Sequence, residues 1–332
     1  VIWTDVVQTI VFLAAIVAAL IVLLMRIPAP MGEIYAALDG AKKLKLIDLS
    51  FDSTVSYTLW TAITGFALLN LAALATDQDL AQRTLTCRSP LHAARSVIAS
   101  QFLGIPVVLV FMLIGALLFV LYNRPDLLGT ATGQSPIPPA DSRKVFLSFV
   151  TGGLPPGLAG LMIAGLFAAG LSSLDSSLNA MSSTFVSDFY KRARPGKSDG
   201  HYLVIGRAGV ATWGVILGGF AAFCVYWQRL TPDESLLEFA LRVMVFAYTG
   251  LLAVFACAVF TRRGTTASVI AALVVGFALT LLMEPAVWKR LPLPEEIATY
   301  KLAFPWRMVI ATACAYGVAC LGARNGRSLS VR

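Results

Sequence analysis

The chain has 332 residues, of which 58% are hydrophobic and 13% are charged, and its formal net charge is +8. Because soluble domains carry about 25% charged residues, this composition excludes an ordinary soluble domain and indicates a protein that crosses a membrane several times. The basic residues are spread through the connections between apolar segments, which fits the positive-inside rule and anionic lipid better than nucleic acid. With two histidines and five cysteines that include no CxxC pair, we expect neither a zinc site, a Ser-His-Asp triad nor disulfides.

Apolar runs of about 20 residues, separated by proline-containing breakers, predict eight membrane-spanning helices. The runs cover residues 4–25, 54–75, 96–122, 157–187, 203–227, 236–260, 266–283 and 306–322. The predicted fold class is all-α, a polytopic membrane protein in which residues 1–332 form a single transmembrane domain. Lys and Arg are denser in the shorter set of connections, so this set and the C-terminus are predicted to be cytoplasmic.

The first span carries a carboxylate, Asp5, with Gln8 and Thr9 on the same helix face. One interpretation is that Asp5 lies at the membrane interface, where it caps the helix or is hydrated. The other is that it is an intramembrane carboxylate directed at an ion path.

The second span contains Asn70 near its middle, and Gln78 and Gln82 follow about two and three turns later. The amide of Asn70 can donate to and accept from a polar solute, and we include Gln78 with it as a candidate substrate-binding residue. An interhelical hydrogen bond is an equally good interpretation of Asn70.

The fourth span is unusual because hydroxyl, amide and carboxylate groups fill its second half. Four of them recur at helical spacing and form one polar stripe: Ser172, Ser176, Asn179 and Ser183. Asp175 lies beside the stripe, and a carboxylate in a bilayer costs about 2.5–3.5 kcal/mol unless it faces protein, water or an ion. Hydroxyl, carbonyl and carboxylate oxygens are the ligands that hard cations prefer. Serine-mediated helix packing would explain the serines but not Asp175, so we expect a cation site here.

In the sixth span, Glu238 and Arg242 are four residues apart, with the acid first. This order favours an ion pair along one helix. Recognition of a substrate carboxylate by Arg242 is the alternative.

Four stretches of the chain resemble the sodium/solute symporter family, which includes sodium–glucose, proline, sialic acid, iodide and monocarboxylate carriers. VIWTDVVQ (1–8) is similar to the start of the family's fifth core helix, and TDQDLAQRTLTCRS (76–89) to the cytoplasmic end of its sixth. The most specific match is GLAGLMIAGLFAAGLSSLDSSLNAMSSTFVSDFYKR (157–192), which resembles the eighth, and FAYTGLLAVFACAVFTRRG (246–264) resembles the tenth.

This resemblance implies a partial LeuT-like fold, in which two inverted five-helix repeats hold ion and substrate sites near the middle of the membrane. Core helices five to ten would lie at about 1–260 and two extra helices at about 266–322. The chain begins with Val1, and we expect it to be a fragment that lacks the first four core helices.

The resemblance also implies site residues. The family's main sodium site falls on Ala169, through its carbonyl, and on Ser172 and Ser173. A second cation site falls on Asp5, Asp175 and Ser176, near Ser172. In the family's sugar carriers an asparagine contacts the sugar, and Asn70 falls at that position. Their aromatic gate is replaced here by Ala73, which argues against a galactose-type pocket.

The function implied is Na+-coupled symport of a small solute, whether sugar, carboxylate or amino-acid-like, across the cell membrane, with Na+ as coupling ion and no other cofactor. Proton coupling through Asp175 is a variant, because burial can raise the pKa of a carboxylate. A transporter-like sensory module of a signalling protein is a rival. An intramembrane enzyme using Asp5 and Asp175 is disfavoured, because the stripe is rich in hydroxyls.

Overall fold

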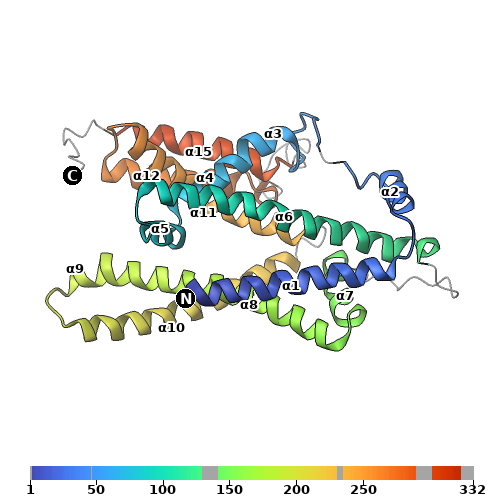
Figure 1. Ribbon diagram of the computed structural model, residues 1–332. Coiled ribbons are helices and arrows are strands. Elements are labelled where there is room, and N and C mark those ends of the chain that lie inside the picture. Colours follow the sequence, from blue (N-terminus) through green and yellow to red (C-terminus); the bar gives the residue numbers. More distant parts are fainter. Residues whose placement is uncertain (1, 46, 129–140, 230–234, 289–300, 323–332) are drawn as a thin grey trace. The chain divides into compact units, whose positions relative to one another are not determined.

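The computed structural model describes residues 2–45, 47–128, 141–229, 235–288 and 301–322, and every regular element in these ranges is a helix (Figure 1). Six helical segments within them are long and apolar enough to cross a membrane: Asp5–Arg26, Leu59–Thr76, Pro90–Asn123, Pro156–Ala193, Asp199–Arg229 and Leu236–Phe260. Two shorter apolar helices, Thr266–Leu282 and Phe304–Cys320, fall at the last two predicted spans. The predicted all-α, polytopic fold class is confirmed.

The helices form two compact units, each with its own core. Unit 1 comprises residues 1–45 and 84–230. Its helices are α1 (Ile2–Arg26), α2 (Met31–Gly40), α6 (Pro90–Asn123), η2 (Pro125–Leu127), η3 (Ser142–Lys144), α7 (Val145–Gly153), α8 (Pro156–Thr184), η4 (Phe185–Tyr190), α9 (Lys191–Ala193) and α10 (Asp199–Arg229). Helix α1 packs against α8 and α6 (Figure 1), and the buried side chains include Ile16, Leu117, Phe149 and Met162.

Local sequence signals set the ends of the long helices in unit 1. Ser89 caps α6 by accepting a hydrogen bond from the His92 N–H, and Pro90 follows at the first helical position, where its missing N–H is harmless. After α6, Arg124 donates hydrogen bonds to Asp126 at 2.7–3.2 Å. This interaction with Arg124 lowers the pKa of the Asp126 carboxyl.

Helices α1 and α8 approach closely at a glycine. A Cβ added to Gly165 of α8 would lie 3.3 Å from the Cα of Phe12 in α1. A small residue at this crossing brings the two backbones together. The polar half of α8 therefore lies within reach of the first turns of α1.

Unit 2 comprises residues 46–83 and 231–332, and α5 spans the boundary at residues 83 and 84. Its elements are α3 (Leu59–Thr61), η1 (Ala62–Phe66), α4 (Ala67–Thr76), α5 (Gln78–Leu85), α11 (Leu236–Phe260), α12 (Thr266–Leu282), α13 (Pro285–Trp288) and α15 (Phe304–Cys320). Leu69 and Ala72 of α4 pack with Val245 of α11 and Met308 of α15.

A π-helical turn, η1, interrupts the segment Leu59–Thr76 where it meets α15. A Cβ added to Gly65 would lie 2.3 Å from the Cβ of Pro305 and 2.4 Å from its carbonyl oxygen. Only a glycine permits this approach, and π turns inside helices mark departures from regular packing. A second glycine contact, between Gly250 of α11 and Gly276 of α12, brings that helix pair together in the same way.

Candidate functional site

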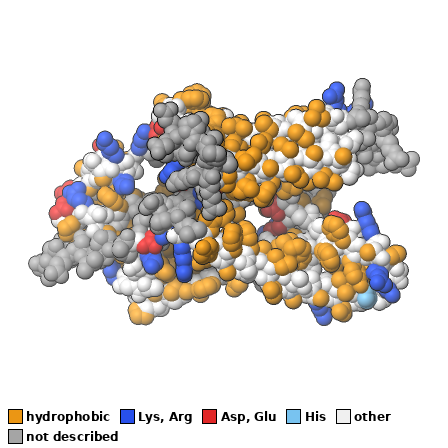
Figure 2. Space-filling view, turned by 180° about the vertical axis from the view of Figure 1, so that it is seen from behind, with side chains coloured by type: hydrophobic (Ala, Val, Ile, Leu, Met, Phe, Trp, Pro, Cys, Tyr) orange, Lys and Arg blue, Asp and Glu red, His pale blue; other side chains and the backbone are white. Residues whose placement is uncertain are grey.

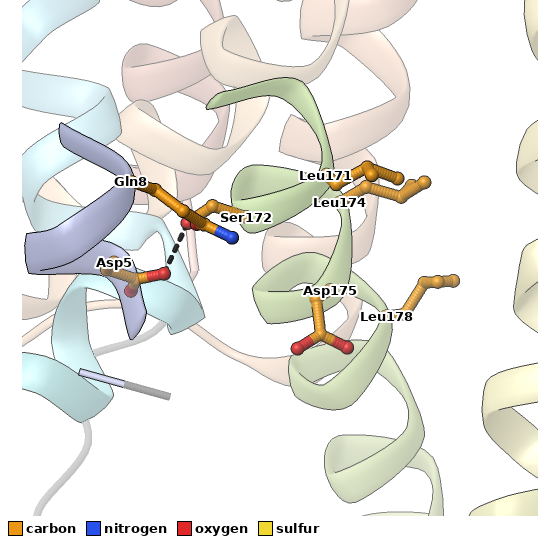
Figure 3. A pocket seen from close by; sticks show the side chains of 7 residues that line it. All are labelled: Asp5, Gln8, Leu171, Ser172, Leu174, Asp175 and Leu178. Carbon is orange, nitrogen blue, oxygen red and sulfur yellow. Dashed lines mark hydrogen bonds between the residues drawn. The ribbon is translucent and has the colours of Figure 1, made fainter. Parts of the chain in front are cut away.

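The serines of α8 divide into two groups according to where their hydroxyls donate. Ser173 and Ser183 of α8, and Ser187 of the adjoining η4, donate to carbonyls of the same helical segment, at 3.5, 3.0 and 2.8 Å. This is the ordinary way in which a helical serine satisfies its hydroxyl. Ser172 instead donates across to α1, with its Oγ 2.5 Å from Oδ1 of Asp5 (Figure 3). The serine-packing interpretation therefore fits part of the stripe, whereas Ser172 bonds to the carboxylate of Asp5 on a second helix.

Asp5 and Ser172 line an open pocket of about 370 Å³. Gln8 of α1 and Asp175 of α8 contribute the other polar side chains, and the remaining lining residues are Leu171, Leu174 and Leu178. In Figure 3, Asp5 and Gln8 extend from α1 towards Ser172, and Asp175 lies about one turn further along α8. The two carboxylates that the sequence predicted to act together therefore line the same pocket.

Gln8 is a lining residue that the sequence analysis placed on the face of Asp5 but did not include in the site. Its Oε1 is buried and has no hydrogen-bond partner among the described residues. A buried polar atom without a partner costs about 1–3 kcal/mol, so a ligand that engages this oxygen would recover free energy. The sequence signal that could have identified Gln8 as a pocket residue was its position three residues after Asp5, on the same helix face.

Asp175 and Ser176 occupy different surroundings on α8. Asp175 is exposed and accepts a hydrogen bond from Nδ2 of Asn179 at 3.4 Å. Ser176, one residue later, is buried. The pocket therefore offers two carboxylates, a hydroxyl and an amide oxygen, a donor set that suits a hard cation such as Na+.

The residues predicted for the main sodium site lie along one face of α8. Ala169, Ser172 and Ser173 are spaced at i, i+3 and i+4, and Ser173 donates to the carbonyl of Ala169. Ala169 and Ser173 are exposed. Ser172 is therefore shared between this face and the pocket that contains Asp5.

The predicted substrate-binding residues, Asn70, Gln78 and Arg242, all belong to unit 2. Among the described residues, no hydrogen bond joins Asn70 to Gln78. Asn70 is exposed and donates from Nδ2 to the carbonyl of Phe66, at 3.0 Å, within its own helix. Gln78 is exposed at the start of α5. In the part of the chain that the structure describes, the Asn70 amide therefore donates along its own helical segment rather than to another helix, and its substrate role stays a prediction.

Arg242 forms an ion pair with a different residue from the one its spacing favoured. Its Nη1 lies 2.8 Å from Oε1 of Glu284, whose Oε2 lies 2.6 Å from Nη1 of Arg307. All three residues are buried: Arg242 is 8% exposed, Glu284 3% and Arg307 5%. Glu238 instead accepts a hydrogen bond from Ser56 at 2.6 Å. The expected pair of Glu238 with Arg242 is therefore replaced by a buried network that connects α11, α15 and the end of α12, and Arg242 as a substrate ligand stays a prediction.

Known proteins resemble this chain over most of its length. A profile of the sodium:solute symporter family matches residues 1–276. The sodium/sialic acid symporter SiaT of Proteus mirabilis is 28% identical over 290 residues, which cover 85% of this chain and 55% of that protein. The human sodium/iodide cotransporter is 28% identical over 283 residues, covering 85% of this chain and 42% of that protein. The sodium/glucose cotransporter of Vibrio parahaemolyticus is 29% identical over 235 residues, covering 67% and 41%.

The chain spans about half the length of SiaT and of the sodium/sialic acid symporter NanT of Aliivibrio fischeri. The family profile nevertheless covers the pocket residues of α1 and α8 and continues into α12. The relatives are transporters of small solutes, and none is named as an enzyme. This multi-pass membrane chain therefore belongs to the sodium:solute symporter family.

Proposed function

We propose that this chain belongs to a secondary transporter that couples the entry of Na+ to the uptake of a small organic solute. The observation that carries the proposal is the 2.5 Å hydrogen bond between Ser172 and Asp5, on a pocket that Asp175 and Gln8 also line. Oxygen donors from two helices that converge in a membrane-spanning unit suit a hard cation. Membership of the sodium:solute symporter family supports Na+ as that cation.

Coupling in this proposal rests on the difference in Na+ affinity between outward-facing and inward-facing states. Ala169, Ser172 and Ser173 would form the part of the main sodium site that α8 supplies. Asp5, Asp175 and Ser176 would form a second cation site, with Gln8 as an additional oxygen donor. Because Ser172 of the main site donates a hydrogen bond to Asp5 of the second site, Na+ bound at one site would influence the ligands of the other.

The solute is proposed only by class. The curated relatives are named for sialic acid, iodide, glucose and monocarboxylate. Asn70 and Gln78 offer amides to a polar solute, and Ala73 supplies no aromatic ring over a sugar. A small carboxylate-bearing solute fits these features better than a galactose-type sugar.

We further propose that residues 1–332 form part of one transmembrane transporter domain in the cell membrane, with a cytoplasmic C-terminus. The density of Lys and Arg in the short connections supports this orientation. Cysteine substitutions in the connection after α9 and in the connection after α1 can test it, because a membrane-impermeant thiol reagent applied to intact cells should label only the latter.

Uptake by the full-length gene product tests the function. Proteoliposomes would be loaded with K+ and supplied with radiolabelled sialic acid, lactate, glucose or iodide under an inward Na+ gradient. At least one solute should accumulate with Na+ and not with choline replacing it, and Ser172→Ala should reduce this accumulation. Uptake driven equally well by a proton gradient without Na+ would instead support proton coupling through Asp175. Uptake of none of the solutes under either gradient, by protein that binds Na+, would favour the sensory alternative.

A further inference from the structure

Residues 185–207 of unit 1 form a strongly basic hairpin. It consists of η4, α9, a turn and the first turns of α10. It contains five basic and two acidic residues, a formal net charge of +3. The basic residues are Lys191, Arg192, Arg194, Lys197 and Arg207, and all are exposed. None of the ion pairs within the described part of the chain includes any of these five. Their charges are therefore available to an anionic partner.

A tyrosine holds the turn of this hairpin in place. The hydroxyl of Tyr202 donates to the carbonyl of Arg194 at 2.9 Å and accepts from the N–H of Lys197 at 3.3 Å. Gly196 allows the chain to reverse between these two contacts, because its φ of +74° is one that other residues rarely adopt. The Nζ of Lys191 lies 5.0 Å from the centre of the Tyr202 ring. The basic side chains are thus presented by an ordered turn.

Aromatic and apolar side chains follow the basic turn along both arms of the hairpin. The Tyr190 hydroxyl lies 3.0 Å from Nε2 of His201, and the two rings stack at a centroid distance of 5.8 Å. The exposed apolar side chains next to this aromatic layer are Phe185, Phe189, Leu203 and Val204. Figure 2 shows Lys and Arg side chains at this end of the hairpin, next to a hydrophobic surface. Apolar, aromatic and basic layers in this order match the acyl region, interface and headgroups of a bilayer leaflet.

We propose that this basic hairpin binds anionic phospholipid headgroups, with Arg192, Arg194 and Lys197 contacting the phosphates and Tyr202 holding the turn that presents them. The layering favours a lipid over a soluble anion, since the adjoining apolar side chains would contact the acyl chains of the same molecules. This lipid site is independent of the proposed transport function, because no residue of the cation pocket takes part in it.

The test is native mass spectrometry of the full-length gene product in detergent, titrated separately with phosphatidylglycerol, phosphatidylcholine and inorganic phosphate. A triple variant, R192Q/R194Q/K197Q, removes three charges from the turn. Because each basic residue near a membrane surface contributes roughly fivefold in affinity, we expect it to bind phosphatidylglycerol about 100-fold more weakly. The matched control, K42Q/K43Q/K45Q, removes three charges from the connection after α2, at the other end of unit 1 (Figure 1), and should bind within threefold of wild type.

Tyr202→Phe tests whether lipid binding depends on the ordered turn as well as on its charges. It retains the ring and every charge but loses both hydrogen bonds to the turn, so it should weaken phosphatidylglycerol binding by a few-fold. The melting temperature of each variant in phosphatidylcholine should equal that of wild type, which shows that the fold is intact. The proposal is wrong if the two triple variants lose phosphatidylglycerol equally, or if phosphatidylcholine or inorganic phosphate binds as tightly as phosphatidylglycerol.

Discussion

Removing one hydroxyl tests whether Ser172 is a cation ligand. In Ser172→Ala, Asp5 loses its 2.5 Å donor and the pocket loses one oxygen. A hydrogen bond to a charged group contributes about 1.5–3 kcal/mol, and 1.4 kcal/mol corresponds to about tenfold in a dissociation constant. If the hydroxyl contributes a similar free energy to Na+ binding, Na+ should bind about 10- to 100-fold more weakly.

The assay is binding of radioactive Na+ to the purified full-length gene product, measured without solute. Ser187→Ala is the matched control, because Ser187 donates only along its own helix or to Asp188 and lies outside the pocket. Asp5→Asn retains an acceptor for Ser172 but removes a charge, and it should weaken Na+ binding at least as strongly. An affinity of the Ser172→Ala protein within twofold of wild type would refute the assignment of this hydroxyl as a ligand.

Three further substitutions test other parts of the account. Glu284→Ala should destabilise the protein by about 3–5 kcal/mol, because it leaves two buried guanidinium groups without their shared carboxylate; a melting temperature equal to that of wild type would contradict this. Gly65→Ala should cost about 1–3 kcal/mol, because its Cβ would overlap Pro305, whereas Gly115→Ala, with nothing within 4 Å of the added Cβ, should be neutral or slightly stabilising in the same thermal assay. Asp175→Asn should weaken Na+ binding severalfold at pH 7 and leave uptake driven by Na+; complete loss of Na+-driven uptake with unchanged Na+ binding would indicate a role for Asp175 in proton transfer.

The membrane helices could be predicted from the sequence because they depend on local properties. Apolar runs are long enough to be recognised one by one, although α6 begins at Pro90, before the predicted start at residue 96. The polar face of α8 could also be predicted, since residues three and four apart share a helix face. Its alignment with Asp5 of α1 came from the family resemblance, because no local pattern specifies which helices pack together.

The partner of Arg242 shows where the prediction from local spacing failed. Glu238 is four residues away, the distance favoured in isolated helices, yet Arg242 pairs with Glu284, 42 residues later. An exposed pair along one helix contributes only a few tenths of a kcal/mol, whereas a buried guanidinium without a carboxylate is costly. Tertiary packing therefore decided the pairing. Gly65 lies in a π turn that approaches Pro305 closely, and no local pattern specifies Pro305 as its neighbour.

The most direct test of the central claim is to locate the cation itself. Crystals of the full-length gene product grown in Na+ would be soaked in Tl+, a monovalent cation with strong anomalous scattering. We predict an anomalous peak within coordination distance of Asp5, Ser172 or Asp175, and its loss in crystals of Ser172→Ala soaked in the same way. A well-ordered pocket without a peak, while Tl+ competes with Na+ for binding to the same protein, would contradict the assignment of this pocket as a cation site.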